Sequence, residues 1–93
     1  MAFDSDVSVK GAAAGATTEI NGSRARLKGF IIGVGANNGT VTFNDGGTAK
    51  FNVAVTGSTS DVAMNIPEQG VLFKSNLNVT TVNTTVTVFY TGA

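Results

Sequence analysis

Few residues of this chain could carry out chemistry, because its 93 residues include no histidine and no cysteine. Their absence removes the usual general base, the thiol nucleophile and nearly all zinc ligand sets. Six carboxylates remain, scattered through the N-terminal segment and the expected turns: Asp4, Asp6, Glu19, Asp45, Asp61 and Glu68. We therefore expect a protein that is not an enzyme and that has no cofactor and no metal ion.

Two motifs resemble ligand sites but have simpler explanations. Asp45 and the pair Asp4 and Asp6 could offer oxygen ligands to Ca²⁺, but their spacing is not that of an EF-hand loop. Turn formation accounts for Asp45. The glycines within residues 33–39 resemble a dinucleotide-binding fingerprint, but a strand-like segment follows them instead of a helix.

The strongest polar feature is the basic row, which consists of Arg24, Arg26 and Lys28. The period of a β-strand places these three side chains on one face. The basic row has two open interpretations. It is a docking stripe for carboxylates or phosphates of a partner, or it is a solvated or edge strand whose charge blocks strand addition. Nucleic-acid binding is not expected, because aromatic platforms and a wider basic surface are missing.

The N-terminal part of the chain is expected to contribute little regular structure. Residues 6–10 alternate polar and apolar side chains, which predicts a short strand with Val7 and Val9 facing inward. Residues 11–18 have no period and are predicted to form a connection. A short helix over residues 12–20 is the alternative, although glycine and paired threonines weigh against it.

A clear alternation begins at the basic row. It predicts a strand over residues 24–34, with Phe30 on the same face as the basic row. The opposite face of this strand would carry Ala25, Leu27 and Ile31. Residues 37–39 tolerate positive φ and residues 40–43 resume the alternation, so these two strands are expected to form a hairpin.

The rest of the chain continues the same pattern. Residues 44–47 form a turn, and further strands are predicted at residues 50–55, 61–66, 71–74, 77–80 and 85–90. Pro67 must end one of them, because proline cannot donate to a ladder. About eight short strands without a helical period predict an all-β fold, an antiparallel β-sandwich of jelly-roll-like or Greek-key type. We expect one domain over residues 1–93, with an N-terminal arm and connection at 1–23 and the sandwich core at 24–93.

The surface is expected to be neutral and rich in hydroxyl groups. Charged residues make up only 13% of the chain and the formal net charge is zero, with a mean hydropathy of +0.19. A chain with so little charge is prone to associate, which favours a homo-oligomer. We expect neither nucleic acid nor a membrane as a partner. No secretory signal is visible, because Asp4 and Asp6 occupy the place of a cationic segment.

Three segments resemble the small β-sandwich structural proteins of tailed bacteriophage virions, such as capsid decoration proteins. They are Arg-Ala-Arg-Leu-Lys-Gly-Phe-Ile-Ile at residues 24–32, the Gly-Thr-Val-Thr-Phe-Asn-Asp-Gly hairpin at 39–46, and residues 66–90. The last segment reads Ile-Pro-Glu-Gln-Gly-Val-Leu-Phe-Lys-Ser-Asn-Leu-Asn-Val-Thr and continues to Val-Thr-Val-Phe-Tyr. These segments form a pattern of strands and turns without a catalytic signature. The N-terminal segment has no counterpart in the resemblance.

The resemblance implies a non-enzymatic virion component that is made in the host cytoplasm and is present in many copies. Its partners would be the major capsid protein or other virion proteins, and a trimer is the favoured oligomer. The alternative is a carbohydrate-binding or receptor-binding β-module of a phage tail or fibre. Such a module would use an exposed aromatic platform, whereas this chain has a single tyrosine and no tryptophan.

Overall fold

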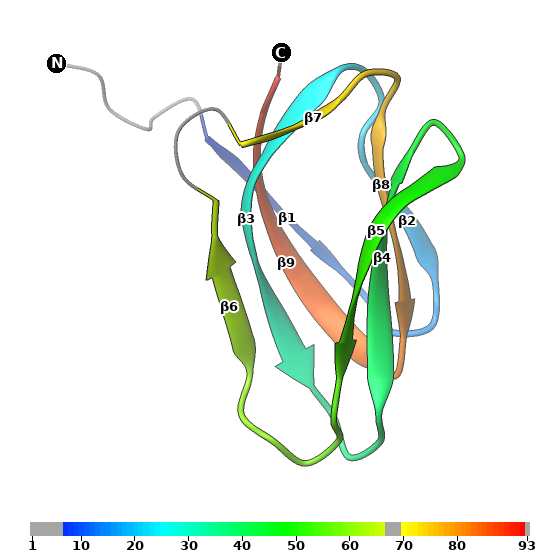
Figure 1. Ribbon diagram of the computed structural model, residues 1–93, viewed down its shortest axis with the longest axis vertical. Coiled ribbons are helices and arrows are strands. Elements are labelled where there is room, and N and C mark those ends of the chain that lie inside the picture. Colours follow the sequence, from blue (N-terminus) through cyan, green and yellow to red (C-terminus); the bar gives the residue numbers. More distant parts are fainter. Residues whose placement is uncertain (1–6, 67–69, 93) are drawn as a thin grey trace, which may run out of the picture.

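The computed structural model describes residues 7–66 and 70–92, which form two antiparallel β-sheets packed face to face (Figure 1). Sheet A contains β1 (Ser8–Ala12), β3 (Ala25–Val34), β6 (Val62–Asn65), β7 (Val71–Phe73) and β9 (Thr84–Gly92). Sheet B contains β2 (Thr17–Asn21), β4 (Gly39–Asp45), β5 (Thr48–Val55) and β8 (Leu77–Val82). The described residues form no helix, and hence no helix that could cross a membrane. The expectations for Asp4, Asp6, Pro67 and Glu68 lie outside the described residues.

The order of the strands is that of a jelly roll. Sheet A runs β1-β9-β3-β6, with β7 also paired to β3, and sheet B runs β2-β8-β4-β5. The pairing is nested, because β1 pairs with β9, β2 with β8, β3 with β6 and β4 with β5. This is the pattern of a long hairpin rolled into two layers. The predicted antiparallel sandwich is confirmed, with nine strands in place of about eight.

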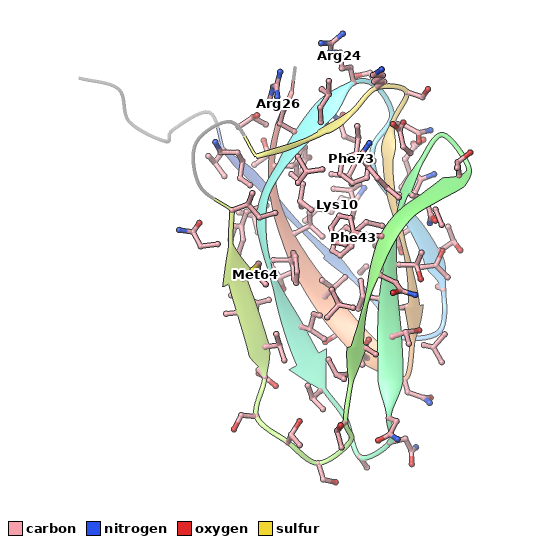
Figure 2. The ribbon with its side chains drawn as sticks, viewed as in Figure 1. Lys10, Arg24, Arg26, Phe43, Met64 and Phe73 are labelled. Atoms are coloured by element: carbon pink, nitrogen blue, oxygen red, sulfur yellow. The ribbon has the colours of Figure 1, made fainter. Side chains whose placement is uncertain are left out.

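The core lies between the two sheets and consists of the inward-facing side chains, which are those of alternate residues along each strand. The aromatic rings at its centre come from both layers: the centroids of Phe30 in sheet A and Phe43 in sheet B lie 5.0 Å apart. Phe43 also stacks on Phe51 of β5 at 4.8 Å, and Phe73 is fully buried. Figure 2 shows Phe43 and Phe73 between the layers. Phe30, Phe43, Phe51 and Phe73 thus help a short chain to build a core without disulfides.

The prediction that residues 24–34 and 40–43 form a hairpin is wrong. These segments form β3 and β4, which lie in different sheets. The loop at residues 35–38 carries the chain from one layer to the other, and β4 pairs instead with β5 and β8. Both strands have an apolar face, and packing Phe30 against Phe43 buries both faces together. If β3 and β4 had instead paired edge to edge in a hairpin, both would lie in one sheet. Other strands would then have to cover their apolar faces.

The expected connection at residues 11–18 also needs correction, as does its helical alternative. Residues 11 and 12 belong to β1, and residues 17–21 form β2, which pairs with β8. Only Ala13–Ala16 remains as a turn, with Gly15 at a φ of 77°. A register shift between Glu19 and Asn21 interrupts β2 just beyond this stretch.

Candidate interaction surface

The basic row lies on and just before β3, and a β-bulge at Lys28 decides where the following side chains point. Between Leu27 and Gly29 the partner residue on β9 advances by only one, so Lys28 is an extra residue in β3. A bulge of this kind shifts the alternation of the strand by one position. Phe30 is consequently buried between the sheets and Ile31 is 39% exposed on the outside. Both facings are the reverse of those expected from the sequence.

The structure keeps the basic row together on the outer side of sheet A. Arg24 is exposed just before β3, and Arg26 and Lys28 are half-buried. Figure 2 shows the side chains of Arg24 and Arg26 at one end of the sandwich, pointing away from the layers. Arg26 pairs with Leu72 of β7 on one side and with Thr91 of β9 on the other, so β3 is an interior strand. The basic row therefore does not protect a sheet edge, and a solvated face or a docking stripe remains.

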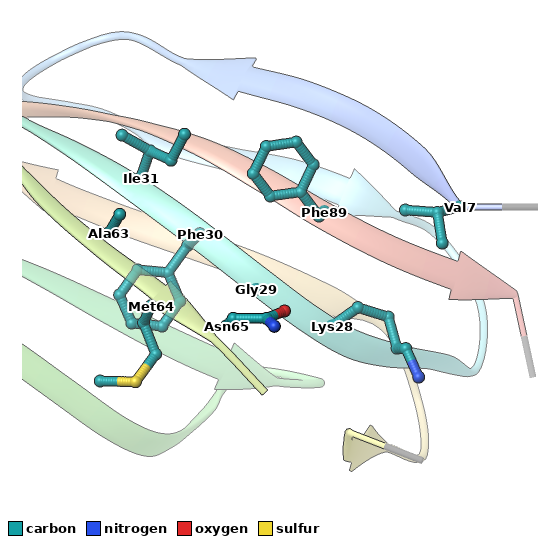
Figure 3. Close-up of a pocket in the computed structure, with 9 residues that line it drawn as sticks. All are labelled: Val7, Lys28, Gly29, Phe30, Ile31, Ala63, Met64, Asn65 and Phe89. Carbon is teal, nitrogen blue, oxygen red and sulfur yellow. The ribbon is translucent and has the colours of Figure 1, made fainter. Parts of the chain in front are cut away.

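Beside Lys28, the outer side of sheet A is hollowed into a shallow groove of about 580 Å³ (Figure 3). We call it the sheet A groove. Its lining includes Val7, Lys28, Ile31, Ala63, Asn65 and Phe89. Gly29 forms part of its floor, between its cross-strand partners Phe89 and Asn65, and a Cβ atom there would lie only 2.8 Å from the backbone oxygen of Met64. The groove is mostly apolar with a cation at one end.

The apolar surface continues from the groove across β1. Val9 is the cross-strand partner of Phe89, shares its outward face and is 59% exposed. The prediction that Val7 and Val9 face inward is therefore wrong. The inward positions of β1 are taken by the alternate residues. These are the buried Ala12 and also Lys10, whose Nζ donates to the carbonyl oxygen of Glu19 at 3.0 Å. We define the sheet A face as the apolar surface made by Val7, Val9, Ile31, Ala63 and Phe89.

The outer side of sheet B has a different character. One row across its four strands contains only polar side chains, namely Thr17, Thr80, Thr42 and Asn52. The hydroxyl oxygens of Thr17 and Thr80 lie 3.0 Å apart, and the side-chain amide of Asn44 donates to the Thr80 hydroxyl at 3.1 Å. Val82, 48% exposed near one end, is an apolar exception. Sheet B thus presents a hydrogen-bonded polar surface, whereas the outer side of sheet A carries the apolar patch that we call the sheet A face.

Two carboxylates within the described residues, those of Asp45 and Asp61, accept hydrogen bonds from backbone N–H groups. Asp45 accepts hydrogen bonds from the backbone N–H groups of Ser75 at 2.9 Å and Lys74 at 3.0 Å, and these bonds lower the pKa of Asp45 from 3.8. Asp61 accepts a bond from the backbone N–H of Val34 at 3.1 Å. Within residues 7–66 and 70–92, no three acidic side chains gather in a way that could hold a metal ion.

Sequence reasoning finds the basic row but misses the apolar surface beside it. The alternation predicts Val7 and Val9 in the core. It also predicts Ile31 on the inner face, because the alternation of residues 24–34 shows no sign of the bulge at Lys28. The Lys28-Gly29 pair inside a strand is the available signal, since glycine within a strand often marks a bulge. Phe89 follows Val88 in a run of apolar residues. The alternation places Val86 and Val88 on one face, and the pairing with β3 shows that this face is the inner one.

Comparison with models of protein families, with curated proteins and with solved structures finds no match for this chain.

Proposed function

We propose that this protein is a non-enzymatic structural component of a bacteriophage particle, and that many copies of it decorate or cement the capsid. The observation that carries the proposal is the difference between the two outer sides of the sandwich. Sheet B offers threonine and asparagine side chains to solvent, whereas the sheet A face offers apolar ones. A partner that covers the sheet A face would account for this difference between the two outer sides.

The physical advantage of covering the sheet A face is the burial of apolar area. Val9 and Ile31 are 59% and 39% exposed, and removing apolar surface from water contributes about 25 cal/mol per Å². Arg26 and Lys28 border the same surface. Charges at the rim of an apolar contact add orientation and speed of encounter more than affinity. The major capsid protein, or another virion protein with carboxylates beside an apolar patch, is the partner that this arrangement fits.

The fold and the composition agree with this role. Jelly rolls are common in viral capsid proteins, although the fold by itself supports the proposal only by analogy. Zero net charge and a low content of charged residues favour association with neighbouring proteins over a monomeric state in solution. The protein would then reside in the virion after its synthesis in the host cytoplasm, as a homo-oligomer.

Jelly rolls also include lectin domains, so carbohydrate or receptor binding is the competing function. A carbohydrate site of that kind needs an exposed aromatic ring. Tyr90 instead packs against the core as the inward-facing partner of Leu27, and Phe89 is only half exposed in the sheet A groove. These placements favour the structural role.

Imaging of intact phage particles that contain this chain, at a resolution that places its strands, tests the proposal directly. We expect density for the jelly roll on the capsid, with sheet A toward the neighbouring proteins and sheet B toward solvent. A glycan-binding screen of the isolated protein provides the second arm. Strong binding to a defined glycan, together with absence of the chain from particles, would contradict the structural role.

A further inference from the structure

One long side of the sandwich has β5 of sheet B and β6 and β7 of sheet A as its edges, and it is open beside β6. The opposite side is bridged, because Lys10 of β1 reaches the backbone of β2. At the open side Met64 of β6 is the cross-strand partner of buried Phe30, so its side chain points between the layers, yet it is 49% exposed. Phe51 and Val53 of β5 pack against the core and are only partly buried. Apolar side chains that belong to the interior are therefore accessible here.

Among the edge strands, β5 is the longest; a register shift interrupts it at Lys50, and the part beyond Lys50 carries no charge. It has eight residues, whereas β1 and β2 have five each, β6 has four and β7 has three. A register shift interrupts β2, and proline follows β6 in the sequence. The single charge of β5 is Lys50, whose Nζ lies over the Phe73 ring at 5.6 Å from its centroid. Natural edge strands are usually short, bulged, charged or proline-containing, because an open edge pairs readily with another strand.

The second half of β5 is regular and unpaired on its outer side. The register with β4 skips Lys50, and from Phe51 to Val55 the pairing is continuous. In an antiparallel pair, alternate residues direct their N–H and C=O groups away from the partner. Within the described part of the chain only β4 pairs with β5, so these backbone groups are free for another strand.

We propose that β5 pairs antiparallel with β5 of a second copy of this chain, in a register centred on Val53. This register places Phe51 opposite Val55 on the inner face and Asn52 opposite Ala54 on the outer face. Lys50 comes opposite Thr56, so like charges do not meet. The two four-stranded sheets become one eight-stranded sheet, and the apolar inner row extends from one copy into the next. The pairing is two-fold symmetric.

A second copy fits this edge better than a charged partner does. In the proposed register apolar side chains meet on the inner face, and residues 51–55 contain no charge that an external partner would recognise. The inference does not depend on the proposed role in a phage particle, since it concerns the isolated protein. It uses a sheet edge that is distinct from the sheet A face.

The test is sedimentation velocity of the full chain over a range of concentrations, with two charge variants. Asn52→Lys with Ala54→Lys places lysines opposite each other twice in the proposed register. Asn52→Glu with Ala54→Lys places a glutamate opposite a lysine instead. Asn52 and Ala54 are exposed, so both double variants should fold, as circular dichroism can verify. Ser23→Lys with Ser60→Lys adds the same two charges in exposed turns and is the matched control.

We expect a dimer whose dissociation constant rises by about tenfold or more in the lysine pair variant, because like charges at an interface cost several kcal/mol. The glutamate and lysine variant and the control should stay dimeric. A monomer at all concentrations, or the trimer that the resemblance to decoration proteins implies, would overturn the two-fold pairing. So would a dimer that tolerates the lysine pair as well as the control does. Binding of particles by a monomeric parent protein would overturn this inference while leaving the proposed function intact.

Discussion

The carboxylate of Asp45 accepts a hydrogen bond from the backbone N–H of Ser75 at 2.9 Å, which ties the turn between β4 and β5 to the segment between β7 and β8. A second bond from the N–H of Lys74 reinforces the link at 3.0 Å. Segments separated by about thirty residues are thus held together at one end of the sandwich. Two backbone donors that would otherwise rely on water are satisfied by one side chain.

The Asp45 link should make stability depend on pH in the acid range. Hydrogen bonds from Ser75 and Lys74 lower the pKa of Asp45 below its ordinary value of 3.8. A lowered pKa in the folded state stabilises the protein above the unfolded pKa, and this contribution is lost as the pH falls through the folded pKa. Asp45→Asn should therefore melt at a lower temperature than the parent at pH 7. The difference should narrow below about pH 4, and a constant difference down to pH 2 would contradict the link.

Thr81 should be required for the turn between β1 and β2. Its side chain is buried, and its hydroxyl donates to the carbonyl oxygen of Ala13 at 2.6 Å. Thr81→Val keeps the shape but leaves that carbonyl without its partner, which should cost about 1–3 kcal/mol of unfolding free energy. Thr87→Val on the half-buried outer side of sheet A is the matched control and should cost much less. Equal losses in urea denaturation would argue against this role of the Thr81 hydroxyl.

Gly39 should tolerate no side chain, because β4 begins there against the chain that joins β8 to β9. A Cβ atom at Gly39 would collide with the backbone oxygen of Val82 and approach Thr84 Cγ2. Neither the backbone nor a buried threonine can move away easily, so Gly39→Ala should destabilise by about 1–3 kcal/mol. Gly11→Ala meets nothing closer than 4.0 Å and should change stability by less than about 0.5 kcal/mol. Thermal melting of both variants checks the contrast.

Arg26 should affect attachment to particles if the basic row docks on acidic groups. Arg26→Glu reverses a charge that borders the sheet A face, and like-charge juxtaposition at an interface costs several kcal/mol. Attachment should weaken while the fold persists, and attachment of the parent should weaken with added salt, since the Debye length is about 8 Å at physiological ionic strength. Co-sedimentation with purified particles measures both effects.

Lys74→Glu, at an exposed position just beyond β7 and outside the sheet A face, makes the same change in net charge and is the control for Arg26→Glu. It should attach as the parent does. Attachment of Arg26→Glu that equals the parent at low and at high salt would leave the basic row as a solvated surface only.

The sequence by itself determined the fold class. Short alternating segments separated by glycine and asparagine can bury their apolar sides only in sheets that pack on each other, and most strands occur where the alternation predicts them. The absence of histidine and cysteine likewise limits the possible chemistry through composition alone. The placement of Arg26 and Lys28 on a single face also followed from the period of a strand.

Only the tertiary structure decided which strands pair and which faces are exposed. The bulge at Lys28 exchanges the facings of Phe30 and Ile31, and it arises from the register with β9, a strand more than fifty residues away. The partner of β4 is likewise chosen by packing across the layers. Val9 follows the alternation that a core residue would follow. In an edge strand, however, either face can be the outer one. The alternation of side chains assigns the residues of a strand to two faces. Only the long-range pairing shows which of these faces meets the core.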